Sequence, residues 1–210
     1  DALDQLQRRY PALDMVGVGQ DFSRTLALPD AVGAALAGPR VVFYPGSSIG
    51  NFTPVQALAF LRQVHAACAA VAGSGLLIGV DLVKAVADLE AAYDDALGVT
   101  AAFNRNLLCH VTRLCGSNFA LADWGHRALY NSALSRIEMY LQARRAVQVQ
   151  WPGGGRSFAQ GECMHTENSY KWTVTGFCAL LREAGFGPPV VWTDAAAPAQ
   201  GRFAVLWAGV

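Results

Sequence analysis

Residues 40–81 read RVVFYPGSSIGNFTPVQALAFLRQVHAACAAVAGSGLLIGVD, and this stretch decides the fold. Residues 40–44 form a short run rich in β-branched and aromatic side chains, which is typical of a buried parallel strand. Thr53 and the proline after it supply a capping hydroxyl and a first helical turn, and the apolar side chains that follow keep helical spacing up to Gly73. Residues 76–80 form a second apolar run. Strand, helix and strand make a βαβ unit with a right-handed crossover, so the sequence predicts an α/β fold.

Ligands of such sheets bind beyond the carboxyl ends of the strands, which here are residues 44–51 and 81–84. The first of these loops combines two glycines, two serines and Asn51. Its spacing fits a ligand-binding loop and, equally well, a turn whose polar side chains cap the next helix. Asp81 at the second strand end can hold a ligand hydroxyl or cap a helix, and the spacing does not choose between these roles.

Outward from this unit, helical and alternating patterns continue the α/β organisation. The predicted helices cover residues 3–10, 26–37 (entered through Pro29-Asp30), 88–115, 124–130 and 169–184. The predicted strands cover residues 14–18, 190–192 and 203–207, with an alternating hairpin or meander from residue 135 that turns at residues 152–155. An Ala/Pro-rich loop joins the last two strands.

Composition narrows the possible partners and sites. The 210 residues carry 16 basic and 16 acidic side chains, so no net charge favours nucleic acid or an anionic membrane. No run approaches the roughly 20 apolar residues that span a bilayer. The five cysteines form no C-x-x-C pair and the four histidines have no metal-ligand spacing, so we expect no metal site and reduced thiols in a cytoplasmic protein. The absence of a G-x-S-x-G elbow gives hydrolase chemistry little support.

Two further segments concentrate polar groups. Residues 92–95 place a tyrosine beside two aspartates, which in isolation is typical of a solvated helix end. Residues 166–171 place a glutamate, an asparagine, a serine and a lysine between a strand-like segment and a predicted helix. A capping turn is the simpler interpretation of that segment.

Linked strings in a fixed order carry a family resemblance over nearly the whole chain. They are FYPGSSIGNF (43–52), GVDLVK (79–84), AYDD (92–95), GVTAAFN (98–104), RIEM (136–139) and TENSYK (166–171). Together they resemble the histidine-specific Nα-methyltransferases of ergothioneine biosynthesis. The methyltransferase domain of ovothiol synthases shares much of this pattern.

The resemblance implies a class I, Rossmann-like methyltransferase sheet with a smaller α+β substrate-binding lobe. We expect residues 1–83 and 172–210 to form the methyltransferase domain and residues 84–171 to form the lobe. In the family the glycine-rich cofactor loop lies upstream of these strings. We therefore expect a sheet that is incomplete at its N-terminal side, lacking about a third of the family's length, or completed by a partner chain.

The resemblance also implies an activity, namely Nα-methylation of L-histidine by S-adenosylmethionine, up to the trimethylated betaine. Asn51 matches a residue that binds the amino and carboxylate end of the substrate, and Tyr93 matches one that binds the carboxylate. Gly46 matches the loop between cofactor and amine. We expect these three residues to form the catalytic centre. The remaining matches are Thr100 and Met139 in the substrate pocket, Glu167 and Ser169 at the imidazole, and Asp21-Phe22 with Gly46 at the cofactor.

These roles agree with the chemistry of the substrate. A neutral imidazole offers one donor and one acceptor, which a carboxylate and a hydroxyl two residues apart can both satisfy. Methyl transfer needs a neutral amine held in line with the methyl group, so positioning supplies most of the barrier reduction and no strong dedicated base is expected. Two other functions stay open, a methyltransferase domain of an ovothiol-type enzyme and a non-catalytic remnant that binds an amino acid or a partner.

Overall fold

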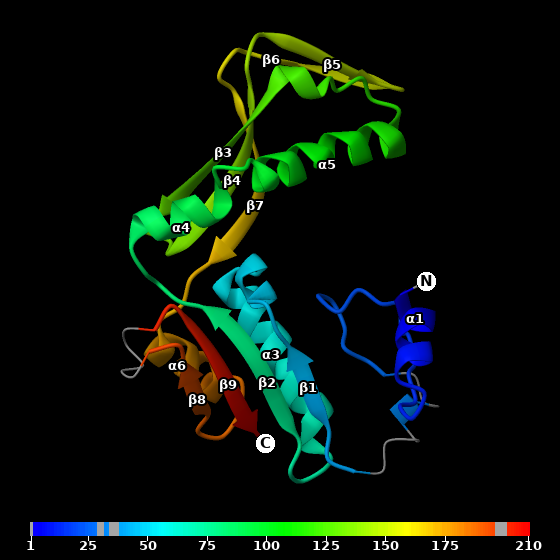
Figure 1. Ribbon diagram of the computed structural model, residues 1–210, viewed down its shortest axis with the longest axis vertical. Helices are drawn as coiled ribbons and strands as arrows, with labels where there is room; N and C mark the ends of the chain where they lie inside the picture. The colour runs from blue at the N-terminus through cyan, green and yellow to red at the C-terminus, as the bar shows by residue number, and fades with distance from the viewer. Residues whose placement is uncertain (1, 29–31, 34–37, 196–200) are drawn as a thin grey trace.

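The computed structural model describes residues 2–28, 32–33, 38–195 and 201–210. Its strands form a four-stranded sheet with the order β1-β2-β9-β8, a three-stranded sheet with the order β3-β4-β7, and the two-stranded β5-β6 hairpin. Figure 1 shows the four-stranded sheet at one end of the molecule and the other strands at the opposite end, joined by two chain crossings.

The predicted βαβ unit is confirmed. β1 (Val41–Tyr44) and β2 (Gly75–Asp81) are parallel, and the chain between them contains the 3-10 helix η1 (Ser48–Asn51) and helix α3 (Pro54–Ala69). α3 begins with a capping box in which Thr53 and Gln56 satisfy each other's backbone N–H groups.

The last two strands complete this sheet as an antiparallel hairpin. β9 (Phe203–Gly209) pairs with β2 along its whole length and also with β8 (Val190–Thr193). A parallel pair followed by a reversed hairpin is the arrangement expected of a Rossmann-like methyltransferase sheet.

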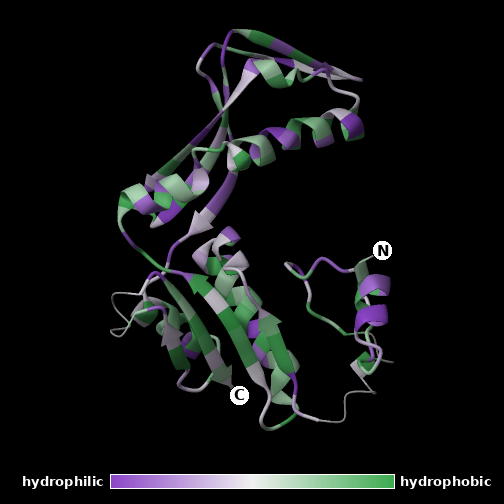
Figure 2. Ribbon diagram, viewed as in Figure 1, coloured by the Kyte–Doolittle hydropathy of each residue, from purple (hydrophilic) through white to green (hydrophobic). Residues whose placement is uncertain are grey.

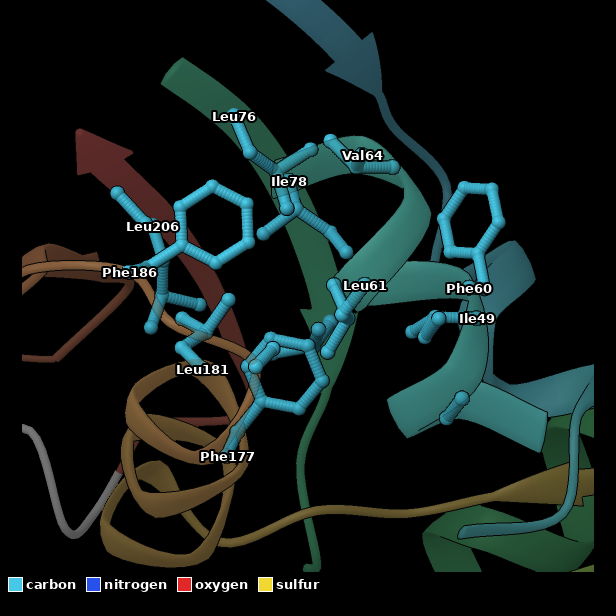
Figure 3. Close-up of a cluster of buried hydrophobic side chains, with 14 of the residues drawn as sticks. Ile49, Phe60, Leu61, Val64, Leu76, Ile78, Phe177, Leu181, Phe186 and Leu206 are labelled. Carbon is cyan, nitrogen blue, oxygen red and sulfur yellow. The ribbon is translucent and has the colours of Figure 1, made fainter. Parts of the chain in front are cut away.

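One face of this sheet packs against α3 and α6 (Val174–Glu183) and encloses the largest core (Figure 3). Figure 3 shows Leu61 of α3 and Phe177 and Leu181 of α6 pointing toward strands β2 and β9. The other face carries apolar side chains that are more than one-third exposed. They are Val41, Phe43, Val190, Trp192 and Val205.

The α+β lobe is built from α4 (Val86–Tyr93), α5 (Val99–Cys115), η2 (Leu121–Asp123) and five strands. The strands are β3 (Trp124–Asn131), β4 (Arg136–Ala143), β5 (Val147–Trp151), β6 (Gly154–Phe158) and β7 (Cys163–Tyr170). The lobe has two buried clusters of its own, one around Trp124 and one around Leu89 and Met139. Figure 2 shows the difference in composition, with mostly hydrophobic strands in the four-stranded sheet and mixed colouring along α5.

Two chain crossings join the lobe to the sheet, and they are hydrogen-bonded to each other. Leu82 and Trp172 form an isolated parallel bridge. The Trp172 N–H donates to Asp81 O at 3.1 Å, and the Val83 N–H donates to Trp172 O at 3.0 Å. These crossings coincide with the predicted boundaries at residues 83–84 and 171–172, and the division into two domains remains our proposal.

Several predicted elements differ from the structure. Residues 124–130 form strand β3 rather than a helix, because they pair along their whole length with β4. Strand β7 continues through Tyr170, so the predicted helix over 169–184 begins only at Val174. Residues 14–18 form no strand, and most of their side chains are exposed.

The N-terminal helix over 3–10 is confirmed as α1 (Ala2–Arg9). The helix predicted over 26–37 falls mainly outside the described residues, as do Pro29-Asp30 and most of the loop between β8 and β9. Of its described residues, 26–28 are not helical and 32–33 are helical. Within the described ranges, no helix has both the length and the apolar character that a membrane crossing requires.

Candidate functional site

The candidate site lies where the carboxyl ends of β1 and β2 meet the end of β7. The loop after β1 approaches β7 so closely that a Cβ atom on Gly50 would lie 2.8 Å from Tyr170 O and 3.3 Å from Tyr170 N. Only glycine fits that approach without a shift of backbone. The loop of the βαβ unit and a strand of the lobe, more than 100 residues apart in the chain, therefore share one wall.

The loop after β1 is also fixed against β2. Gly46 and Ser47 both have left-handed backbone conformations, with φ of 75° and 58°. The Ser47 hydroxyl oxygen accepts the backbone N–H of Asp81 at 2.8 Å. Gly79 of β2 lies beside the loop, but the absence of a side chain there makes room mainly for the Phe203 ring, which a Cβ atom would approach to 2.9 Å. Ser47, in a conformation unusual for a residue with a side chain, thus holds Gly46 and Asn51 at the strand ends.

Glu167 and Ser169 lie in β7 at alternate positions, so their side chains point to the same side of the sheet. Their cross-strand partners in β4 are Met139 and Ile137, which belong to the buried cluster below α4. The segment predicted as a capping turn is therefore a strand, and its alternation places the carboxylate and the hydroxyl on the same side of the sheet.

Asn51 from η1 lies beside Glu167, close enough for its carboxamide to lower the pKa of the Glu167 carboxyl. Burial raises the pKa of the Glu167 carboxyl above its ordinary value, and the Asn51 carboxamide offsets part of that rise. This contact brings together a residue of the sheet and a residue of the lobe that the resemblance assigned to the same substrate.

Tyr93 is the last residue of α4, and its hydroxyl lies 2.7 Å from the Ser169 hydroxyl. The His126 ring positions the backbone of Tyr93. Its Nε2 atom lies 2.7 Å from Tyr93 O, and its Nδ1 atom lies 3.0 Å from the side-chain amide nitrogen of Asn104. A neutral ring that donates through Nε2 and accepts through Nδ1 satisfies both contacts. His126 and the buried Asn104 thus fix where Tyr93 stands.

Lys171 completes the site, although the sequence analysis assigns it no role. Its side chain is 0% exposed, and its ammonium lies 2.9 Å from each of Asp81 Oδ2, Tyr93 Oη and Ser169 Oγ. Asp81 also accepts from Lys84 at 2.5 Å. The Asp81 carboxylate therefore binds two lysines, one through each oxygen, and does not cap α4. The available signal was the spacing of Lys171 two residues after Ser169, which in a strand places both on one side.

The remaining predicted substrate residues differ in their surroundings. Met139 is 3% exposed and lies opposite Glu167. Thr100 stands at the start of α5, where its backbone N–H and its hydroxyl both bond to Asp95. These bonds and that of the Val99 N–H lower the pKa of Asp95 to about 2. Thr100 bonds to Asp95 at the start of this helix, and its assignment to the substrate pocket remains a prediction.

Of the two residues predicted at the adenine, Phe22 lies near the end of β1. Its ring packs edge-on against Tyr44 and Phe60, with centroid distances of 6.0 and 6.1 Å. Asp21 is exposed and bonds to its neighbours Ser23 and Arg24, and the bond with the Ser23 hydroxyl lowers the pKa of Asp21. Phe22, but not the Asp21 carboxylate, is thus joined by packing to the strand that leads into Gly46.

A cavity of about 200 Å³ opens beside Glu167 between α5 and β7. Its lining residues are Phe103, Asn104, Asn106, Leu107, His110, Thr166 and Glu167. Groups of three or more His, Cys, Asp or Glu side chains that could hold a metal do not occur in the part of the chain that the structure describes.

Comparison with known proteins gives a consistent result. The family described as histidine-specific, SAM-dependent methyltransferase matches residues 1–208. The chain is 42% identical over 189 residues to a histidine N-alpha-methyltransferase of Mycolicibacterium smegmatis, covering 89% of this chain and 57% of that protein. It is 39% identical over 194 residues to the protein of the same name from Mycobacterium tuberculosis, covering 91% and 58%.

A solved structure of an S-adenosylmethionine-dependent methyltransferase from Clostridium acetobutylicum aligns with this chain at 8% identity and a TM-score of 0.48. The alignment covers 98% of this chain and 69% of the Clostridium chain. The chain spans less than three-fifths of the length of the two mycobacterial relatives. By the match over residues 1–208, the chain belongs to the family of histidine-specific, S-adenosylmethionine-dependent methyltransferases.

Proposed function

We propose that this chain binds L-histidine and takes part in its Nα-methylation by S-adenosylmethionine, up to the trimethylated betaine of ergothioneine biosynthesis. The observation that carries the proposal is the convergence of Asn51, Tyr93, Glu167 and Ser169 from three separate elements. The family membership and the names of the mycobacterial relatives support the same substrate. A further relative, ergothioneine biosynthesis protein 1 of Schizosaccharomyces pombe, is 31% identical over 147 residues.

The Glu167 and Ser169 pair would recognise the imidazole. Their side chains leave β7 on the same side, where Glu167 lies beside Asn51 and Ser169 bonds to Tyr93. A carboxylate accepts the imidazole N–H, and a hydroxyl can donate to the other ring nitrogen. A substrate that lacks one of these ring groups would leave a polar partner of the protein unpaired, which is the strongest source of discrimination in a closed site.

Asn51 and Tyr93 would hold the amino-acid end. The carboxamide of Asn51 stands at the end of the loop after β1, and the hydroxyl of Tyr93 stands across from it at the end of α4. Since methyl transfer needs a neutral amine lone pair, these residues would contribute orientation rather than strong base catalysis. Protons would leave through water.

The residues near β1 fit S-adenosylmethionine, whose sulfonium group supplies an electrophilic methyl when bound. A Cβ atom on Gly46 would meet nothing within 4 Å, so the backbone of this loop is open for close approach. The Phe22 ring is 43% exposed beside Tyr44 and offers an apolar face for a purine. We propose that Phe22 and Gly46 contact the cofactor, with Asp21 nearby in the chain.

The composition supports a small molecule as the partner rather than a nucleic acid or a membrane. The formal net charge is zero, so no general attraction to polyanions arises. The free cysteines agree with a reducing environment, and we propose that the protein acts in the cytoplasm.

The direct test is a methylation assay on the full-length protein. We expect incubation with L-histidine and S-adenosylmethionine to add one, two and three methyl groups to the α-amine, detected by mass spectrometry. Nα-methylation of histidinol or histamine should be much weaker, because these molecules lack the carboxylate. A folded full-length protein that gives no methylated histidine would falsify the enzyme, and binding of histidine without transfer would favour the non-catalytic alternative.

A further inference from the structure

Lys171 is a charged side chain in a place where charge is costly. Its ammonium is completely buried, and removal of an ammonium from water is unfavourable unless it is paired and hydrogen-bonded. The structure meets that demand with three acceptors, namely the carboxylate of Asp81 and the hydroxyls of Tyr93 and Ser169, each at 2.9 Å. An ammonium has three N–H groups, so all of its donors are used within the protein.

The bonds of Lys171 constrain the two hydroxyls that it contacts. An ammonium can only donate, so the Tyr93 and Ser169 oxygens accept from it and both keep their own protons. The two oxygens are 2.7 Å apart, and one of the two protons fills the bond between them. The other proton is left over. While that bond is in place the pair presents one O–H donor, and a ligand that accepts from both hydroxyls replaces the bond.

The same contacts make that donor stronger. A hydroxyl that accepts from a cation is polarised, and chains of hydrogen bonds reinforce one another in surroundings of low dielectric constant. Lys171 also lies 4.5 Å from the centroid of the Tyr93 ring, so the ring is held in place as well as the hydroxyl. Beside this donor, Glu167 and Asn51 supply the acceptor side of the pocket.

We infer that Lys171, held by Asp81, is a positioning residue that keeps the Tyr93–Ser169 pair as a hydrogen-bond donor toward the amino-acid substrate. This inference rests on the proposed binding of histidine at the same site. Lys171 touches no reacting atom in this role and acts only through the two hydroxyls.

A matched comparison separates this role from a structural one. Lys171 and Lys84 both bind Asp81, but only Lys171 contacts the hydroxyls, whereas Lys84 binds Asp81 and the backbone oxygen of Arg202. Lys171→Met removes the ammonium at nearly constant length and leaves a packed apolar chain. Lys84→Met removes the other cation from the same carboxylate. If Lys171 contributes only an ion pair with Asp81, both variants should lose thermal stability and neither should lose histidine affinity specifically. If Lys171 orients the Tyr93 and Ser169 hydroxyls, only Lys171→Met should lose histidine affinity.

The experiment measures histidine binding by calorimetry and steady-state kinetics in the full-length protein, with thermal melting as the control for folding. We expect Lys171→Met to weaken histidine binding and raise its KM by about 10- to 100-fold, the range for a lost charge-assisted hydrogen-bond network. The Kd for S-adenosylmethionine should change less than about threefold, and Lys84→Met should leave the histidine Kd within the same factor. Lys171→Arg, which keeps a cation, should recover part of the affinity.

Each result decides the question. A folded Lys171→Met protein with unchanged histidine affinity overturns the inference, as does an equal loss in Lys84→Met. If Lys171→Met does not fold, Lys171→Gln, which retains a donor toward Asp81 but no charge, carries the same expectation with a loss of at least about fivefold. Failure of the proposed function looks different, because the unchanged protein would then neither bind nor methylate histidine.

Discussion

Glu167 holds a carboxyl group in partly buried surroundings, with Asn51 beside it. Because burial raises its pKa above the ordinary value of 4.5, the folded state takes up the proton more readily than the unfolded state. The favourable contribution of Glu167 to stability is therefore present below pH 4.5 and is lost as the pH rises through the raised pKa. We expect Glu167→Gln to match the original protein near pH 4 and to melt at a higher temperature at pH 7, measured without ligand.

Glu162 provides a control of opposite sign. The backbone N–H of Ala159 and the Arg156 guanidinium lower the pKa of Glu162, so its contribution is present above its ordinary pKa and lost as the pH falls. Glu162→Gln should therefore melt at a lower temperature at pH 7, with the difference shrinking toward acid. A Glu167→Gln protein that is less stable than the original at pH 7 would contradict the assignment of Glu167 to a desolvated site.

Single residues were predicted unevenly from the sequence. The order of the strings identified Asn51, Tyr93, Glu167 and Ser169, and the structure places them side by side in two pairs, Asn51 with Glu167 and Tyr93 with Ser169. The role of Lys171 was not predicted, because a lysine in a polar run is usually solvated and its ion pair with Asp81 forms only in the folded chain. The role of His126 was not predicted for the same reason, since its two hydrogen-bond partners lie 22 and 33 residues away along the chain.

Among the elements, the loop after β1 is the one whose shape the site needs most. Gly50 touches the backbone of Tyr170, which cannot move without disturbing the end of β7. Gly50→Ala should therefore push η1 away from β7, lower the free energy of unfolding by about 1–3 kcal/mol and weaken histidine binding, because Asn51 follows directly. Chemical denaturation and calorimetry measure the two effects.

Gly19→Ala is the matched control for that loop. A Cβ atom at Gly19 would meet nothing within 4 Å, so this substitution should stay within about 0.5 kcal/mol of the original stability. The explanation by close approach fails if Gly50→Ala is as harmless as Gly19→Ala.

Prediction of elements succeeded where periodicity and punctuation agreed. β1, α3 and β2 were found because apolar runs are bounded by Pro45, Thr53-Pro54 and Gly73. β3 was predicted as a helix. Its burial in the structure does not alternate between buried and exposed residues, and within the strand only Trp124 is fully buried, so its sequence carries no clear strand pattern. The strand is stabilised by pairing with β4, a long-range interaction that a local pattern does not contain.

At the scale of the whole molecule, the candidate site is formed by residues of both proposed domains, the four-stranded sheet with its helices and the α+β lobe. Asn51 comes from the sheet side, whereas Tyr93, Glu167 and Ser169 come from the lobe. The connection between them consists of two crossings held by backbone hydrogen bonds and by the Asp81–Lys171 ion pair. Sequence patterns located both crossings, but they could not show that the crossings pair with each other, because their contact spans about 90 residues.

A ligand that binds residues on both sides should stabilise this junction. Such a ligand binds fully only when the sheet and the lobe are in their native positions. Its binding therefore lowers the population of states in which the hydrogen bonds between the two crossings are broken. We expect saturating L-histidine to slow amide hydrogen exchange at Val83 and Trp172, whose N–H groups bond across the junction, in the full-length protein. Exchange in the β5–β6 hairpin, which Figure 1 places at the far end of the lobe, should stay unchanged and serves as the internal control. Histidine that binds while protecting only Tyr93 and β7 would mean that the substrate sits within the lobe alone, and Asn51 would then lose its assigned role.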